Sequence, residues 1–186
     1  IDAGLGDDIV DAGDGNDDVI GADGNDDLSG NTGNDTLQGE DGDDTITGDD
    51  GADHIYGGDG QDYLDGGAGH DSIETGAGGG IALGEGGNDS ILGGADNDAL
   101  QGGLGDDVIA GEAGADVVVG DDGDDTLDGG TDDDEVWGDS GHDLLAGGEG
   151  NDTISAGFGN DVVNSDLGSA TADNGDDLIY GEDGDD

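Results

Sequence analysis

The stretch that decides the fold is Gly57–Glu74, which reads GGDGQDYLD followed by GGAGHDSIE. It consists of two nine-residue units with the pattern Gly-Gly-x-Gly-x-Asp-x-aliphatic-x. The sixth position holds Asp62 in the first unit and Asp71 in the second. The eighth position holds Leu64 and then Ile73. Because both units keep glycine, aspartate and an aliphatic residue at fixed places, they predict one repeated structural element.

The same unit extends along nearly the whole chain. Counted in nines from Ala3, the sequence runs to Asn164 without an insertion or deletion, which makes eighteen units. The eighth position is Val, Ile or Leu in seventeen of them, and Ala82 is the exception. The full column is Val10, Val19, Leu28, Leu37, Ile46, Ile55, Leu64, Ile73, Ala82, Ile91, Leu100, Ile109, Val118, Leu127, Val136, Leu145, Ile154 and Val163. A fixed period of this kind predicts a solenoid of stacked repeats.

Each unit predicts one short strand and one turn. The seventh and ninth positions are mostly polar, as in Thr36 and Gln38, so the eighth side chain is the one of three that points inward. Glycine every few residues excludes a helix. Two units would return the chain to its starting side and make an 18-residue coil. Successive coils would then stack as parallel strands about 4.8 Å apart, which predicts an all-β parallel solenoid.

The nonapeptide resembles the RTX repeat of hemolysin-type calcium-binding proteins. The resemblance covers essentially the whole chain and rests on the glycine, aspartate and aliphatic columns together. It implies a right-handed parallel β-roll of about ten coils, with two sheets and aliphatic side chains between them. It also implies rows of calcium ions in the turns along both edges, each ion bridging neighbouring turns. Such proteins typically leave bacteria unfolded and fold outside, where calcium is plentiful.

The sixth position carries the chemistry of the unit. Ca²⁺ prefers six to eight oxygen ligands from carboxylates and backbone carbonyls, and a glycine-rich turn exposes carbonyls beside its aspartate. Stacked coils place aspartates 18 residues apart around one ion, which divides the predicted ligands into two ladders. The first ladder is Asp8, Asp26, Asp44, Asp62, a gap at Gly80, Asp98, Asp116, Asp134 and Asp152. The second is Asp17, Asp35, Asp53, Asp71, Asp89, Asp107, Asp125, Asp143 and Asp161, and Asp177 is a further predicted ligand after the regular array.

Several alternatives to calcium are weaker. Aspartate favours solvated turns, but turn preference does not hold one position constant while its neighbours vary. The chain has no Cys and only three His, which disfavours soft metals. Mg²⁺ demands tighter octahedral geometry and keeps its waters, and an EF-hand would need flanking helices. Multiple Ca²⁺ ions are therefore the predicted cofactor, and no catalytic residue is predicted.

One unit departs from the pattern. Gly80 removes a carboxylate between Asp62 and Asp98, which predicts a weakened or empty site there. Restoring the carboxylate by Gly80→Asp is expected to add one bound ion. In the same unit Ala82 predicts either a locally thin core or a register shifted by one residue.

Two further columns describe the turn. The fourth position is Gly except at Asp96 and Asp132, where the loop shape is in doubt. The fifth position is often Asn or Asp, as at Asn16 and Asn25, which we attribute to their tolerance of the left-handed backbone region.

The composition is that of a polyanion. The chain of 186 residues has 53 Asp plus Glu, no Lys or Arg, and a formal net charge of −53. Such a charge excludes nucleic acid and anionic membranes as partners, and no apolar stretch is long enough to insert into a membrane. With 47 Gly and few large apolar residues, the chain is expected to be disordered until an external cation neutralises it.

The chain divides into a regular repeat roll, 1–164, and an irregular continuation of the same roll, 165–186. The pattern slips over 165–171, where Ala170 stands in place of aspartate, and returns at Gly175, Asp177 and Ile179. Because the chain begins and ends inside a repeat and lacks an initiator Met, we expect it to be a segment of a longer array.

Some outward positions on one side are apolar, and two interpretations stay open. They mark either a contact with neighbouring repeats, another domain or a second copy, or scattered surface residues. They are Tyr63, Ile81, Leu83, Val117, Val119 and Trp137. The three histidines, His54, His70 and His142, are far apart in the array and are expected on the surface.

Two functions follow from these expectations. The first is a calcium-binding structural module of a secreted or cell-surface protein, which folds on binding Ca²⁺ and acts as a rigid spacer, fibre or surface element, and is not an enzyme. The second is a calcium-dependent folding and secretion module attached to an extracellular protease, lipase or polysaccharide-modifying enzyme. Ice binding is disfavoured, because it would need a flat column of Thr and Asn at the third and fifth positions, and threonine occurs at the third position only as Thr32 and Thr131.

Overall fold

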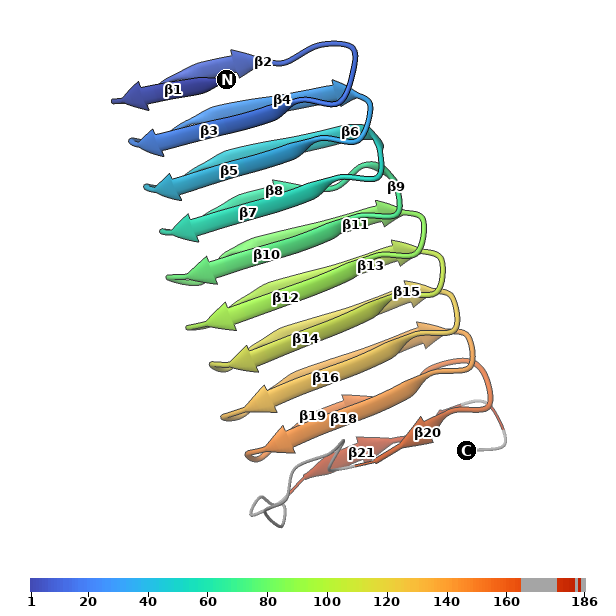
Figure 1. Ribbon diagram of the computed structural model, residues 1–186. Coiled ribbons are helices and arrows are strands. Elements are labelled where there is room, and N and C mark those ends of the chain that lie inside the picture. Colours follow the sequence, from blue (N-terminus) through green and yellow to red (C-terminus); the bar gives the residue numbers. More distant parts are fainter. Residues whose placement is uncertain (165–176, 183, 185–186) are drawn as a thin grey trace.

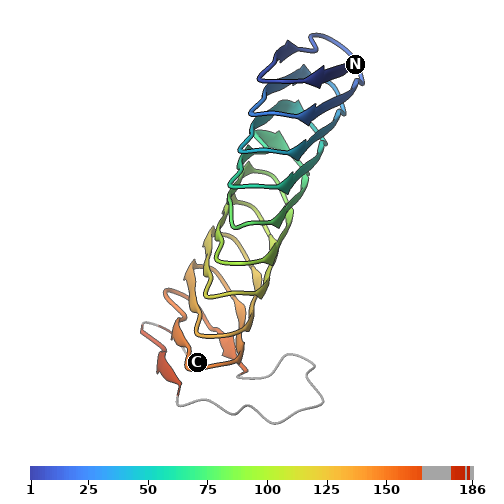
Figure 2. The ribbon, with the colours of Figure 1, turned by 90° about the vertical axis from the view of Figure 1, so that its left-hand side faces the viewer.

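The computed structural model of the chain describes residues 1–164, 177–182 and 184 (Figure 1). These residues form strands and turns, and none of them belongs to a helix. Accordingly, no helix in the described part of the chain is long and apolar enough to span a membrane. The coils stack from the N-terminus downward into an elongated rod (Figures 1 and 2).

The strands lie in two parallel sheets, and consecutive strands along the chain alternate between them, apart from the short β9 (Figure 1). The first sheet contains, in spatial order, β1 (Asp2–Leu5), β3 (Asp18–Asp23), β5 (Thr36–Asp41), β7 (His54–Asp59), β10 (Ser72–Ala77), β12 (Ser90–Ala95), β14 (Val108–Ala113), β16 (Thr126–Thr131), β18 (Leu144–Glu149) and β20 (Val162–Val163). The second contains β2 (Ile9–Asp11), β4 (Asp27–Thr32), β6 (Thr45–Gly51), β8 (Tyr63–Asp65), β11 (Ile81–Gly86), β13 (Ala99–Leu104), β15 (Val117–Asp122), β17 (Glu135–Ser140), β19 (Thr153–Ser155) and β21 (Leu178–Tyr180), with β9 (Ala68–Gly69) beside β6 and β11.

The register confirms a coil of two units. Leu37 pairs with Ile55 in the first sheet, and Ile46 pairs with Leu64 in the second, each 18 residues further on. The eighth positions therefore stack on one another within each sheet. A parallel β-solenoid of about 18 residues per coil is the architecture that the repeat predicts.

The strands are longer than the sequence pattern indicates. A typical strand such as β5 begins at the seventh position and extends to the third position of the next unit, six residues rather than three. Leu37 at the eighth position and Gly39 at the first are both buried. The ladder continues past the glycine, because Asp41 still pairs with Asp59. Glu40, at the second position, has φ 77°, so the chain bends there without leaving the sheet.

The core is a thin double row of aliphatic side chains. Those from Val19 to Ile154 at the eighth position are at most 1% exposed. Ala82 lies in the same row, fully buried, and pairs with Leu64 and Leu100 without a shift. The irregular unit therefore has a locally thin core and no bulge.

The last strand continues the second sheet after extra residues. β21 pairs with β19 by placing Ile179 opposite Ile154. The two residues are 25 positions apart, seven more than in a regular coil. The expected slip over 165–171, with Ala170, and the expected Gly175 lie outside the described residues.

Candidate metal centres

The turn that connects the two sheets occupies the fourth to sixth positions, and its backbone is held by the coils on either side. The amide of Gly42 donates to the carbonyl of Asp59 at 2.8 Å, and the amide of Thr45 donates to the carbonyl of Asp26 at 2.8 Å. Between these two amides lie those of the fifth and sixth residues, which donate to side chains. The turn is thus part of a ladder that runs from coil to coil.

The fifth position supplies one of these acceptors. The amide of Asn34 donates to Asn16 Oδ1 at 3.1 Å, and the amide of Asn88 donates to His70 Nδ1 at 2.7 Å. No Asn or Asp of this column has a positive φ in the described units. The left-handed explanation of the column is therefore wrong, since these residues are acceptors for the next coil.

The left-handed backbone is instead found at the second and fourth positions. Eight residues other than glycine adopt a positive φ at the second position of the eighteen repeat units, and Ala22, with φ 87°, is one of them. At the fourth position Asp96 and Asp132 have φ 69° and 82°. Like most fourth-position glycines they have a positive φ, although a smaller one, so the chain still turns there.

The sixth-position aspartates meet in the two predicted ladders. One carboxylate oxygen, Oδ1, accepts the backbone N–H of the aspartate one coil earlier, as Asp62 does from Asp44 and Asp71 does from Asp53. The N···O distances between successive aspartates are 2.7–3.1 Å. Asp177 joins the first ladder at its end, where it accepts from Asp152 at 3.1 Å.

The other carboxylate oxygen, Oδ2, is buried without a hydrogen-bond partner at every sixth-position aspartate of the eighteen repeat units. These aspartates are Asp8, Asp17, Asp26, Asp35, Asp44, Asp53, Asp62, Asp71, Asp89, Asp98, Asp107, Asp116, Asp125, Asp134, Asp143, Asp152 and Asp161. From Asp26 to Asp161 the whole residue is at most 4% exposed. A buried oxygen anion without a donor is unstable unless a cation compensates it.

In most units whose first residue lies between Gly21 and Gly138, the orphaned oxygen and a backbone carbonyl of the following coil both lie close to the first-position glycine. A Cβ placed on Gly48, the first residue of its unit, would lie 2.5 Å from Asp53 Oδ2 and 2.6 Å from the carbonyl oxygen of Gly66. A Cβ placed on Gly84 would likewise lie 2.5 Å from Asp89 Oδ2 and 2.6 Å from the carbonyl oxygen of Gly102 in the next coil. Two oxygen acceptors converge here with no proton between them. At Gly48 and Gly84 these oxygens fill the space that a side chain would need.

Burial raises the pKa of the sixth-position carboxyls from Asp44 to Asp143. Desolvation is the main cause, the backbone N–H bond opposes it, and the carboxylates of adjacent coils add to it, as Asp71 and Asp35 do for Asp53. The pKa rises to about 6 for Asp53, Asp62, Asp116 and Asp143, and to about 7 for Asp89, Asp125 and Asp134. A cation at each carboxylate would reverse this effect.

The donor set fits a hard divalent cation. Among the described residues no three His, Cys, Asp or Glu side chains form one metal-binding group. A site built here must therefore combine aspartate with backbone carbonyls, which is the oxygen environment that Ca²⁺ accepts. The sequence located the carboxylates but not the first-position carbonyls, because a carbonyl leaves no trace in residue identity.

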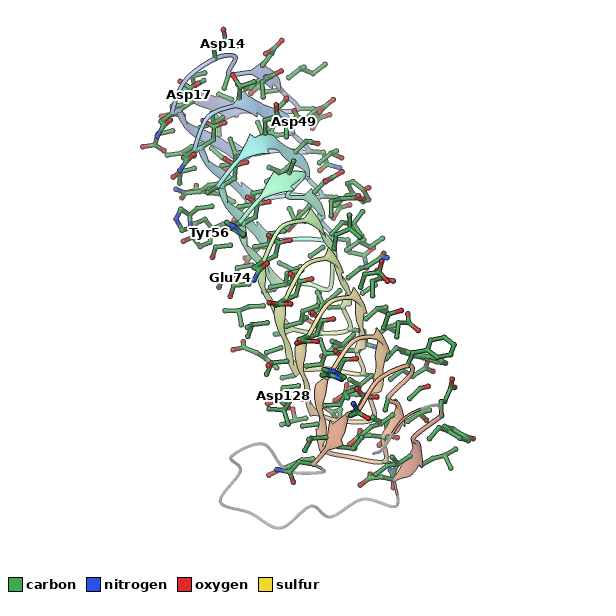
Figure 3. The ribbon with its side chains drawn as sticks, turned by 90° about the vertical axis from the view of Figure 1, so that its right-hand side faces the viewer. Asp14, Asp17, Asp49, Tyr56, Glu74 and Asp128 are labelled. Atoms are coloured by element: carbon green, nitrogen blue, oxygen red, sulfur yellow. The ribbon has the colours of Figure 1, made fainter. Side chains whose placement is uncertain are left out.

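The outward apolar residues are neighbours on the second sheet. Ile81 pairs with Tyr63, and Val119 pairs with Trp137. Ile81, Tyr63 and Trp137 are 44%, 39% and 37% exposed. Elsewhere acidic side chains project from the rod, among them Asp14, Asp49, Glu74 and Asp128 (Figure 3).

Comparison with protein families gives one result that spans the chain. The family described as RTX calcium-binding nonapeptide repeat (4 copies) matches in overlapping segments, which are residues 1–28, 20–55, 29–64, 38–73, 47–82, 74–109, 83–118, 101–136, 111–145, 137–172 and 169–186. A comparison with curated proteins gives no significant match. The family binds Ca²⁺ in the turns of its repeats, and in this chain those turns hold the orphaned carboxylates. With the whole sequence matched and the fold that the repeat requires, the chain belongs to the RTX calcium-binding nonapeptide repeat family.

Proposed function

We propose that this chain is a calcium-dependent structural module that is an expanded polyanion without metal and folds into a rod when Ca²⁺ binds. The seventeen buried, unpartnered Oδ2 atoms are the observation that supports this proposal best. The aspartates of the two ladders, with Asp177, would be the side-chain ligands, and first-position carbonyls would complete the sites.

The electrostatics support coupling between binding and folding. The chain contains no Lys or Arg, so no internal cation can neutralise its 53 acidic residues. Folding stacks the ladder carboxylates on one another and removes them from water, which is unfavourable for charged groups. Calcium supplies the missing positive charge, and its binding free energy then becomes folding free energy.

The geometry also supports cooperative folding. Asp53 bonds to the preceding coil through Oδ1, and its Oδ2 lies beside the carbonyl of Gly66 in the following coil. An ion held by that carboxylate and carbonyl would join neighbouring coils. Binding at one site would therefore order the next, as expected for a solenoid with nearest-neighbour coupling.

We infer further that the module serves as a rigid spacer, fibre or surface element of a secreted protein and is not itself an enzyme. Repeats of this family are typical of secreted proteins. The same buried, unpartnered carboxylate oxygen recurs at every regular turn, and the coils stack into one rod (Figure 2). A uniform rod transmits length and stiffness, which is what a spacer needs.

A calcium titration followed by far-UV circular dichroism tests the proposal. The metal-free chain at pH 7.5 is expected to be disordered and to gain strand signal cooperatively at about 0.1–1 mM Ca²⁺, the range of extracellular modules. The same concentration of Mg²⁺ is the control and is expected to leave the chain disordered. A chain that remains disordered at about 10 mM Ca²⁺ overturns the proposal.

A further inference from the structure

The turn with Gly80 is missing its carboxylate, and the same unit has an unusual residue at its first position. Thr75 stands there, where the other units of the array have glycine or, in the first two units and the last, alanine. Both departures fall in one nine-residue unit. They are therefore to be explained together.

The side chain of Thr75 lies where a carboxylate lies in other turns. In an ordinary turn the first-position glycine leaves room for Oδ2 of its own aspartate, next to the carbonyl of the following coil. Thr75 is 3% exposed, and its hydroxyl donates to the carbonyl of Gly93, which is the equivalent carbonyl of the following coil. The hydroxyl also lies 3.0 Å from Oδ1 of Asp98.

The hydroxyl changes the chemistry of this position. Elsewhere two acceptor oxygens converge and need a cation between them. Here a hydroxyl that carries a proton faces the Gly93 carbonyl, so the carbonyl has a donor. Asp98 Oδ1 accepts the amide of Gly80 at 2.6 Å in addition to its contact with Thr75.

A carboxylate restored at Gly80 would be crowded by Thr75. A Cβ on Gly80 would lie 3.2 Å from both Cβ and Cγ2 of Thr75 and 3.1 Å from the carbonyl oxygen of Asp62. The preceding Gly79 has φ +77°, which no other fifth-position residue of the array shows.

We propose that Thr75 is the residue that sets metal occupancy in this turn, because its hydroxyl takes the place of a calcium ion and closes the first ladder locally without metal. This inference rests on the proposed calcium function. It corrects the expectation that Gly80→Asp alone adds an ion, since Thr75 occupies the room that the new carboxylate needs.

Native mass spectrometry of the calcium-loaded chain counts the ions directly. Gly80→Asp is expected to leave the count unchanged. The unit rebuilt as Thr75→Gly with Gly79→Asn and Gly80→Asp is expected to bind one ion more. A count that rises for Gly80→Asp alone overturns the proposal, and a wild-type chain that binds no calcium overturns the proposed function itself.

Urea unfolding at saturating calcium tests the hydroxyl without rebuilding the turn. Thr75→Val keeps the shape and loses the donor, so its urea midpoint is expected to fall by about 0.5–1 M. Thr75→Ser keeps the hydroxyl and is expected to stay near wild type, as is Thr45→Val, the same change at an exposed strand position. If Thr75→Val is as stable as Thr75→Ser, the side chain merely fills space and the proposal is wrong.

Discussion

The sixth-position aspartate has two oxygens with different roles. Oδ1 of Asp125 accepts the amide of Asp107 at 2.8 Å, whereas Oδ2 is buried and unpartnered. An asparagine can keep the first interaction, through its carbonyl oxygen, but not the negative charge. Substitution therefore separates the hydrogen-bonding role of the residue from its metal-binding role.

Asp125→Asn is expected to act in opposite directions with and without calcium. In calcium the variant should lose one ligand and about 1–3 kcal/mol of unfolding free energy. Without calcium at pH 7.5 the folded form should be less unfavourable in the variant than in the wild type, because the variant lacks one buried unpaired charge. Asp124→Asn, the same charge change at the exposed fifth position, is the control and should have little effect in either condition. Equal effects of the two variants would contradict the assigned roles.

The second position tests backbone strain in the same way. Ala22 has φ 87°, a region that costs an L-residue about 1–2 kcal/mol. Ala22→Gly is therefore expected to stabilise the calcium-loaded rod by about 1 kcal/mol in urea unfolding. Ala113→Gly, in strand β14 at a third position outside this region, should instead destabilise by about 0.5–1 kcal/mol. If both substitutions destabilise the rod, the substitution at Ala22 relieves no backbone strain.

A regular six-residue strand contributes two inward positions to the core, and outside β10 and β11 only the first of them has a large side chain. In β13, Leu100 is 1% exposed and Leu104 is 62% exposed. Leu100→Ala is expected to cost about 2–4 kcal/mol of unfolding free energy, because the thin core cannot fill the cavity. Leu104→Ala removes the same atoms from the surface and should change stability by less than about 0.5 kcal/mol. Comparable losses for both variants would contradict the placement of the core.

Sequence reasoning identified the solenoid because its signal is periodic. The Val, Ile and Leu column predicted the inward face and the aspartate column supplied the proposed ligands. Both columns stack in the structure with the expected spacing of 18 residues. The reach of the strands was missed, because Gly39 and Glu40 carry no strand propensity. They belong to β5 because the coil on either side supplies hydrogen-bond partners, which is a tertiary effect.

The irregular unit shows a second limit of sequence reasoning. Gly80 was recognised as a missing ligand, since it breaks a column. The role of Thr75 was not, because the contact between the first position and the sixth exists only once the turn is closed. Similarly, the sequence pattern attributed the fifth-position residues to a left-handed backbone. In the structure their side chains, such as the amide oxygen of Asn16 and the imidazole of His70, accept hydrogen bonds from backbone amides of the next coil.

At the scale of the whole molecule, burial shifts the pKa of the ladder carboxyls from Asp44 to Asp143 in the same direction. Their pKa is raised in the fold, to about 7 for Asp89, Asp125 and Asp134, whereas an unfolded Asp has a pKa of about 3.9. The metal-free fold thus binds more protons than the unfolded chain between these values. Its stability is fully present below about pH 4 and is lost as the pH rises through about 7.

The metal-free chain is therefore expected to gain strand signal in far-UV circular dichroism when it is acidified from pH 8 to about pH 4. Calcium at pH 8 should produce the same spectrum, because protons and calcium both neutralise the buried carboxylates. The sequence pI is about 4.1, so sedimentation at the acid end must show a monomer before the signal is assigned to folding. A metal-free chain whose spectrum does not change across this range would contradict the raised pKa values. The carboxylate ladders would then have to be solvated in the absence of metal, and calcium would be closing the turns as well as neutralising them.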